Sequence, residues 1–547
     1  MSALSLRSLA ESAQEGQRVN TGGVSNELGG LTRREIVKRG GALGLAVGAS
    51  GTLAGLASAA TAPRRGGTLR VGLIGGNPGR DNLDPHLDGS SVTSQCLRQL
   101  VYSKLTDQLP SGKYVPQLAE SLTPNKDASV WQIKLKRGVM FHDGSELTVD
   151  DVIYTFQRIL DPKNKLDDTR GNIDMIDPAG IRKVGKYTMT VRLVRPWSDF
   201  PTAVGQRLVT IIKRGAAPPF TLQNTNGTGA FRLTAWKPGE SFSVAANRDY
   251  FESGKPYLDR VNVFAFPDPV ARVNALVANQ VDCICDVPAA QAAVVRQRGL
   301  NLIVNPGGAW TPICMNTQQP PFDDVRVRKA MKLVIDRKKA IAAALGGFGD
   351  VGNDLFAVND PLYASGIPQR EYDPDQARSL MRQAGALRTP ITLRAAEAVS
   401  DMVPLALVFE QGAKEAGMNV NVVRDPTDTF WTKTWGVAPF TFSAWSYRPF
   451  YAQWLQSFVS YNAEETRWND RYQKRASRLV YRSAATSNEA QRRGLTREAQ
   501  RLLWEYGGYI IPYTKQSLDA STKRVRGIQP HPFEFLGNYR LWNVWLA

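Results

Sequence analysis

The chain has 547 residues, of which 42% are hydrophobic and 22% are charged, and it carries a formal net charge of +18 at pH 7. This length exceeds the size at which one hydrophobic core stops growing, so we expect at least two lobes, and the composition excludes a disordered or fibrous protein. Lysines and arginines are scattered through amphipathic segments without a basic block, which favours a solvated surface and argues against a nucleic-acid partner.

The first 59 residues are typical of a twin-arginine export signal. Arg33 and Arg34 precede a weakly apolar run rich in glycine and alanine that extends over 40–60. Glycines make this run a poor membrane-spanning helix, and the small residues at 57–59 offer a cleavage site. The pattern predicts a signal at 1–59 and a periplasmic mature protein; the alternative is an uncleaved N-terminal anchor.

The twin-arginine route transports folded cargo, which often holds a cofactor, but the sequence shows no site for one. Three histidines lack metal-ligand spacing, and four cysteines include no CxxC pair. Cys283 and Cys285 share one face of an expected strand, so either could meet Cys314 in a neighbouring strand. A disulfide and buried free thiols both stay open, and we expect neither cofactor nor metal.

From residue 66 onward, strand-like and helix-like segments alternate without tandem repeats, which predicts an α/β fold. The first strand runs into a loop that ends at Leu83-Asp84-Pro85, and loops after strands are where α/β proteins place ligands. In chain order, the expected elements are strands at 67–74 and 131–135, a helix at 148–161, a hairpin at 231–244, a helix at 270–278, a strand at 281–287, a strand ending at 315–317, a helix after 323–324, helices at 374–381 and 401–416, a strand at 418–423, a helix at 487–506 and a strand at 509–513.

Local signals set the limits of some of these elements. Thr148 is a good N-cap with Asp151 three residues further on, and Asp161-Pro162 ends that helix. Asp373-Pro374 begins another helix, because proline fits the first helical position.

Several motifs in this order resemble family 5 of the bacterial extracellular solute-binding proteins, which includes binders of oligopeptides, dipeptides and nickel. They are Leu83-Asp84-Pro85, residues 139–144 with 147–152, Gly227-Thr228-Gly229, and residues 316–328 ahead of Ile335-Asp336-Arg337. Each motif is short, but together they follow the order and spacing of the family across nearly the whole mature chain.

The resemblance implies an α/β fold of two lobes that close like a flytrap over a solute. The first lobe comprises 66–311 and is completed by 518–547, with an extra subdomain inserted at about 104–205. The second lobe comprises 312–517. A chain that passes twice between lobes restricts their motion to a hinge.

The resemblance also indicates where a ligand would bind. In peptide-binding relatives, a Trp-x-x-Asp motif holds the amino end of the peptide, and the matching segment is Trp445-Ser446-Tyr447-Arg448. An arginine repels an ammonium group but offers a planar fork of donors to a carboxylate or phosphate. We therefore predict that Arg448 binds an anionic group and that Trp445 supplies a stacking face. The alternatives are a surface ion pair for Arg448 and core packing for Trp445.

Weaker candidates lie in two further segments. Gly89, Ser90 and Ser91 follow the Leu83-Asp84-Pro85 loop and offer backbone and hydroxyl groups, although this segment could equally be a flexible loop. Trp435 belongs to an aromatic-rich region, much of which we expect in the core.

These observations predict a monomeric, non-catalytic binding component of an ABC importer, with a peptide or peptide-like solute and membrane permease subunits as partners. The alternatives are an exported hydrolase or a non-transport receptor on the same scaffold. The hydrolase is disfavoured because the sequence offers no nucleophile paired with a base.

Overall fold

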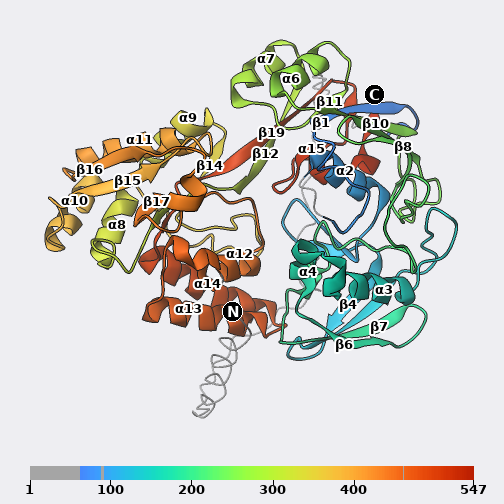
Figure 1. The fold of residues 1–547 in the computed structure, drawn as a ribbon, viewed down its shortest axis with the longest axis horizontal. Coiled ribbons are helices and arrows are strands. Elements are labelled where there is room, and N and C mark those ends of the chain that lie inside the picture. The colour runs from blue at the N-terminus through green and yellow to red at the C-terminus, as the bar shows by residue number, and fades with distance from the viewer. Residues whose placement is uncertain (1–61, 88–90, 460) are drawn as a thin grey trace, which may run out of the picture. The chain divides into compact units, whose positions relative to one another are not determined.

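The computed structural model describes residues 62–87, 91–459 and 461–547 (Figure 1). The predicted signal at 1–59 and the candidate residues Gly89 and Ser90 lie outside the described residues.

The first sheet has the strand order β12-β19-β11-β1-β10-β9-β8, and β14 pairs with β19. Its strands are β1 Thr68–Ile74, β8 Phe231–Lys237, β9 Ser241–Ala246, β10 Arg260–Phe266, β11 Cys283–Ile284, β12 Asn301–Ala309, β14 Gly349–Val351 and β19 Tyr513–Ser521. Helices α2 (Val92–Val101), α6 (Pro269–Val277) and α7 (Ala292–Gln297) pack against it. Central β1 lies parallel to both β10 and β11 and has fully buried Leu69, Val71 and Leu73, as expected for a strand covered on its faces.

The second sheet has the order β16-β15-β17-β13-β18. Its strands are β13 Ile313–Met315, β15 Ile391–Ala395, β16 Val420–Arg424, β17 Phe440–Phe442 and β18 Tyr509–Ile510, and the associated helices are α8 Val325–Leu333, α9 Arg337–Leu345, α10 Pro374–Gln383 and α11 Met402–Glu415. Apolar side chains from both groups form one core cluster.

A third, antiparallel sheet has the order β4-β5-β7-β6. Its strands are β4 Ala119–Pro124, β5 Val130–Leu135, β6 Ile176–Lys183 and β7 Thr188–Leu193; nearby elements are β2 Thr106–Gln108, β3 Tyr114–Pro116, α3 Val149–Leu160, α4 Asp167–Ile173 and α5 Phe200–Ala203. Its core cluster continues into helices α12 (Phe450–Phe458), α13 (Arg471–Ala484) and α14 (Glu489–Tyr506). The Ser198 amide, between β7 and α5, donates to the Ala484 carbonyl at 2.6 Å, so the segment that follows this sheet contacts α13 directly.

Two antiparallel strands, β12 and β19, carry the chain between the first and second sheets and lie side by side in Figure 1. Only a few residues separate β12 from β13, and β18 from β19. Asp519 of β19 is fully buried and accepts hydrogen bonds from Asn305 of β12 at 2.8 Å and from the Leu536 amide at 2.6 Å. These contacts fasten the paired strands to the C-terminal segment.

The C-terminal segment returns to the beginning of the first sheet. It contains β20 (Val525–Arg526), α15 (Phe535–Asn538) and β21 (Trp545–Leu546), and β20 pairs with β21. A β-carbon built on Gly67 would lie 3.1 Å from Cδ1 of Leu546, so the two ends of the described chain are neighbours.

Several sequence-based expectations for the elements are confirmed. The helix predicted behind Thr148 is α3, and the Asp151 carboxylate accepts the Thr148 amide at 2.8 Å, as in a capping box. The hairpin of β8 and β9 and the helices α6, α10, α11 and α14 also form near the predicted positions.

Two expected strands are wrong in extent. The strand at 281–287 shrinks to Cys283–Ile284, because Asp286 adopts a φ of 51° that turns the chain out of the sheet. The strand at 509–513 divides into β18 and the start of β19, because Pro512 has no amide to donate at the point where the chain changes sheet.

The disulfide considered for Cys314 does not form. Cys283 lies in the first sheet, whereas Cys314 lies in the second, opposite Thr441 and Tyr509. All four cysteines are free and buried, so the alternative of buried thiols describes the structure.

Candidate functional site

Trp445 lies beside the end of β12 and is paired there with Trp310. Its backbone exchanges two hydrogen bonds with Trp310, at 2.9 and 3.0 Å, and the two indoles stack with ring centroids 5.9 Å apart. Trp445 is 7% exposed and Trp310 is 1% exposed. Trp445 is therefore part of the core, as the alternative interpretation of this residue held, and its ring has a fixed position.

Arg448 lies over this indole. Its guanidinium carbon is 5.0 Å from the centroid of the Trp445 ring, and its Nη1 is 3.5 Å from the Ser446 hydroxyl. A cation over an indole face gains about 0.5–2 kcal/mol, depending on its exposure. A guanidinium carries a planar fork of N–H donors, which is the geometry that a planar anion such as a carboxylate requires.

Tyr447 points to a different partner. Its ring centroid is 3.7 Å from that of Phe533, which belongs to the C-terminal segment. Burial raises the pKa of the Tyr447 hydroxyl, and the nearby Asp360 and Asp199 carboxylates raise it further. The motif at 445–448 therefore brings together Trp445 and Arg448, while Tyr447 joins two parts of the chain.

Glu465 contacts both candidate tryptophans, and the sequence alone did not indicate it. It is 3% exposed, and its carboxylate accepts hydrogen bonds from four side chains. One oxygen, Oε1, accepts from the Ser443 hydroxyl at 2.6 Å and the Trp435 indole at 3.2 Å. The other, Oε2, accepts from the Tyr509 hydroxyl at 2.7 Å and the Trp445 indole at 3.2 Å.

The Glu465 carboxylate experiences two opposing influences. Burial is the larger influence and raises its pKa above the usual value, while the hydrogen bonds from Ser443, Tyr509, Trp445 and Trp435 offset part of that rise. Both predicted tryptophans are thus held by one acid. No sequence pattern links Glu465 to them, although a glutamate close behind an aromatic-rich segment is a signal that could have been considered.

Ser91 has a structural role in the first half of the chain. It is the N-cap of α2, where its hydroxyl accepts the Ser94 amide at 3.3 Å and donates to the Asp81 carboxylate. Thr93 also donates to Asp81, at 2.6 Å. These bonds engage the Ser91 hydroxyl in capping.

A charged contact joins the N-cap of α5 to α14. Asp199 and Arg492 form an ion pair with an N–O distance of 3.5 Å, and Asp360 lies close enough to interact with both. Burial raises the pKa of Asp199 to about 7, and the Asp360 charge raises it whereas Arg492 lowers it. The carboxylates of Asp199 and Asp360 and the guanidinium of Arg492 therefore lie together where the N-cap of α5 contacts α14.

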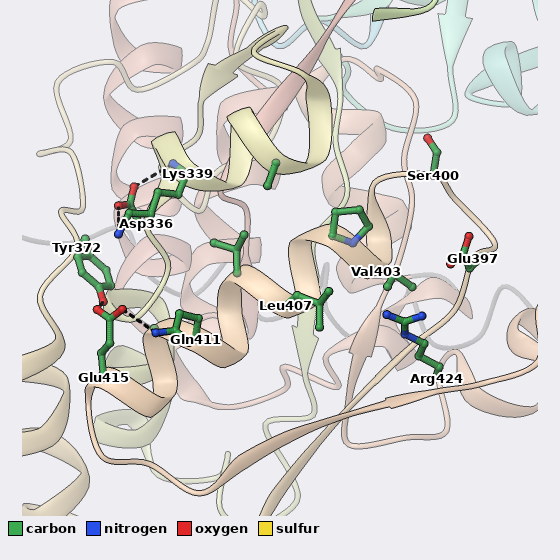
Figure 2. Close-up of a pocket in the computed structure, with 14 residues that line it drawn as sticks. Asp336, Lys339, Tyr372, Glu397, Ser400, Val403, Leu407, Gln411, Glu415 and Arg424 are labelled. Atoms are coloured by element: carbon green, nitrogen blue, oxygen red, sulfur yellow. Dashed lines mark hydrogen bonds and ion pairs between the residues drawn. The ribbon is translucent and has the colours of Figure 1, made fainter. Parts of the chain in front are cut away.

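A cavity of about 530 Å³ lies elsewhere, between α9 and α11 (Figure 2). Its apolar side is formed by α11 residues that include Val403 and Leu407, and Glu415 in its wall accepts hydrogen bonds from Tyr372 and Gln411. Its lining contains none of the residues that the sequence predicted to bind ligand. The cavity and the segment at 445–448 are therefore separate features.

Within residues 62–87, 91–459 and 461–547, no three or more His, Cys, Asp or Glu side chains gather into a group that could hold a metal ion. In the same part of the chain, no helix has both the length and the apolar character of a membrane span.

Comparisons with known proteins define the class. The solved structure of HbpA2 from Haemophilus parasuis matches with a TM-score of 0.75 at 22% identity, covering 88% of this chain and all of that one, so the fold is that of the α/β periplasmic binding proteins. The model of bacterial extracellular solute-binding proteins, family 5 Middle, matches residues 113–466. This chain belongs to that family of extracellular, non-catalytic solute-binding proteins.

Two curated relatives span most of the sequence. The oligopeptide-binding protein AppA of Bacillus subtilis (strain 168) is 25% identical over 528 residues, covering 89% of this chain and 92% of AppA. The glutathione-binding protein GsiB of Shigella dysenteriae serotype 1 (strain Sd197) is 24% identical over 465 residues, covering 81% of this chain and 89% of GsiB. The predicted family, fold class and absence of catalysis are thereby confirmed.

Proposed function

We propose that this protein is the solute-binding component of an ABC importer, exported by the twin-arginine route through the signal at 1–59. It captures a peptide or peptide-like solute with an anionic group in the periplasm, as a monomer, and delivers it to membrane permease subunits. The names of AppA and GsiB, which bind an oligopeptide and glutathione, support this class of solute.

The two lobes would be 66–311 with 518–547, including the insertion at 104–205, and 312–517. The paired strands β12 and β19 support this division, because they supply the two passages of the chain between sheets. A solute that contacts both lobes shifts the equilibrium toward the closed form, which is the state that a permease would recognise.

The observation that carries the anionic preference is the position of Arg448 over Trp445. Arg448 would donate to the anion, Trp445 would support the Arg448 guanidinium from below, and Ser446, Tyr447 and Trp435 would surround them. From the first lobe, Gly89, Ser90 and Ser91 would complete the contacts, with the Ser91 contribution coming from its backbone because its hydroxyl caps α2.

The test is a thermal-shift comparison of matched solutes with the mature protein. Glutathione is compared with its diethyl ester, and trialanine with trialanine amide, since each pair differs in its carboxylates. A ligand that binds only the native state raises the melting temperature, so the acid of each binding pair should raise it more than the neutral form. Equal shifts within both pairs would refute the anionic preference, and recovery of a cleaved ligand would refute pure binding.

A further inference from the structure

The buried carboxylate of Glu465 accepts hydrogen bonds from the indole N–H groups of both candidate tryptophans, Trp435 and Trp445. A carboxylate offers about four acceptor positions, and Ser443, Tyr509, Trp445 and Trp435 fill four. The donors come from sequence positions up to 44 residues away, so the carboxylate links segments that are distant in the sequence.

We propose that Glu465 is a positioning residue of the ligand site, which fixes the Trp445 indole and, through that indole, the guanidinium of Arg448. This inference rests on the proposed function, because it assigns Glu465 a role in ligand affinity in addition to packing.

Three contacts determine where the Trp445 ring lies. Glu465 accepts its N–H at the ring edge, Trp310 stacks against it with an interplanar angle of 12°, and Arg448 lies 5.0 Å from its centroid. Without the edge contact, the ring would keep its stacking partner but lose the bond that sets its rotation.

The charge of Glu465 also acts through the ring. A cation is attracted to an indole by the negative face of the π-system, and a carboxylate bound to the indole N–H increases the electron density of that face. The four donors of Glu465 are all uncharged, so none of them neutralises a charge on this carboxylate, and in its ionised form it favours the guanidinium of Arg448 across the ring.

The variant Glu465→Gln separates positioning from simple electrostatics. Its carboxamide keeps the shape but provides one acceptor oxygen for four donors, so an indole N–H faces an amide NH₂. If Glu465 acted only as a nearby negative charge, its removal would strengthen binding of glutathione, which is a net anion. Positioning predicts the opposite sign, with binding weakened about tenfold.

The matched control is Glu464→Gln, because Glu464 is the neighbouring residue of the same type and is exposed. Glutathione affinity is measured by calorimetry for the wild type, both variants, Trp445→Phe and the double variant Trp445→Phe/Glu465→Gln. If Glu465 acts through Trp445, Glu465→Gln costs much less in the Trp445→Phe background than in the wild type. Unchanged or tighter binding by Glu465→Gln, or additive losses in the double variant, would overturn the proposal.

A ligand-free measurement keeps this inference distinct from the proposed function. Fluorotryptophan-labelled protein gives a fluorine resonance for Trp445, assigned by its disappearance in Trp445→Phe. We expect this resonance to shift or split in Glu465→Gln and to stay in place in Glu464→Gln. If glutathione does not bind the wild type, the choice of solute fails, whereas an unmoved Trp445 resonance in Glu465→Gln contradicts the positioning role itself.

Discussion

Trp310 and Trp445 form a closed pair, in which stacked indoles 5.9 Å apart are backed by two reciprocal backbone hydrogen bonds. Because Trp310 is 1% exposed and also stacks on Phe356 at 5.9 Å, Trp310→Ala leaves a large cavity in the core. We expect a loss of about 3–5 kcal/mol in the free energy of unfolding, measured with urea. Trp431→Ala is the matched control, since Trp431 is 39% exposed, and it should cost clearly less. A loss for Trp310→Ala that is no greater than the loss for Trp431→Ala would contradict this role of the pair.

Arg448→Asp should weaken the binding of glutathione by about thirtyfold or more, which corresponds to about 2 kcal/mol. The reversed charge repels the carboxylates of the solute. Arg424→Asp makes the same charge change at an exposed position in the wall of the separate cavity, so it should leave affinity unchanged. Calorimetric titration measures both, and unaltered affinity in Arg448→Asp would remove Arg448 from the site.

The four thiols should be unreactive in the native protein. Each cysteine is free and at most 1% exposed, and burial raises the pKa of every thiol, which keeps the reactive thiolate scarce. Titration of the mature protein with a chromogenic disulfide, without any reductant, should detect no rapidly reacting thiol before denaturation and four after it. Two thiols in the denatured, unreduced protein would reveal a disulfide.

Asp519 should make stability fall as the pH rises. Burial raises the pKa of its carboxyl to about 7, whereas an unfolded aspartate titrates near 3.9. Between about pH 4 and pH 7 the native protein retains a proton that the unfolded chain has released, so the contribution of this group declines by up to about 1.4 kcal/mol per pH unit. Asp519→Asn removes this decline. Urea unfolding at several pH values compares the two proteins, and parallel pH profiles would contradict the assignment.

Sequence signals were sufficient where neighbouring residues decide the structure. Thr148 and Asp151 cap α3 as predicted, because both lie in one helical turn. The same logic could have identified Ser91 as the cap of α2, since a serine stands directly before an amphipathic segment. The family resemblance, carried by motif order, then supplied the fold class.

The remaining features depend on contacts between distant residues. Glu465 lies 20 residues from Trp445 and 44 from Tyr509, and its hydrogen bonds exist only after three segments have packed. The break at Pro512 depends likewise on the change of sheet at that point. Neither periodicity nor composition contains this information, which is why the sequence pointed to Trp445, Trp435 and Arg448 as candidates but did not indicate Glu465.

Because Gly67 and Leu546 are neighbours, the same fold could be encoded by a chain that starts and ends at a different loop. A short linker could join them, with new termini opened at the hairpin between β6 and β7, where Val184 is 62% exposed. Such a circularly permuted protein would retain every sheet, and reporter domains could be attached at the new opening instead of beside the first sheet.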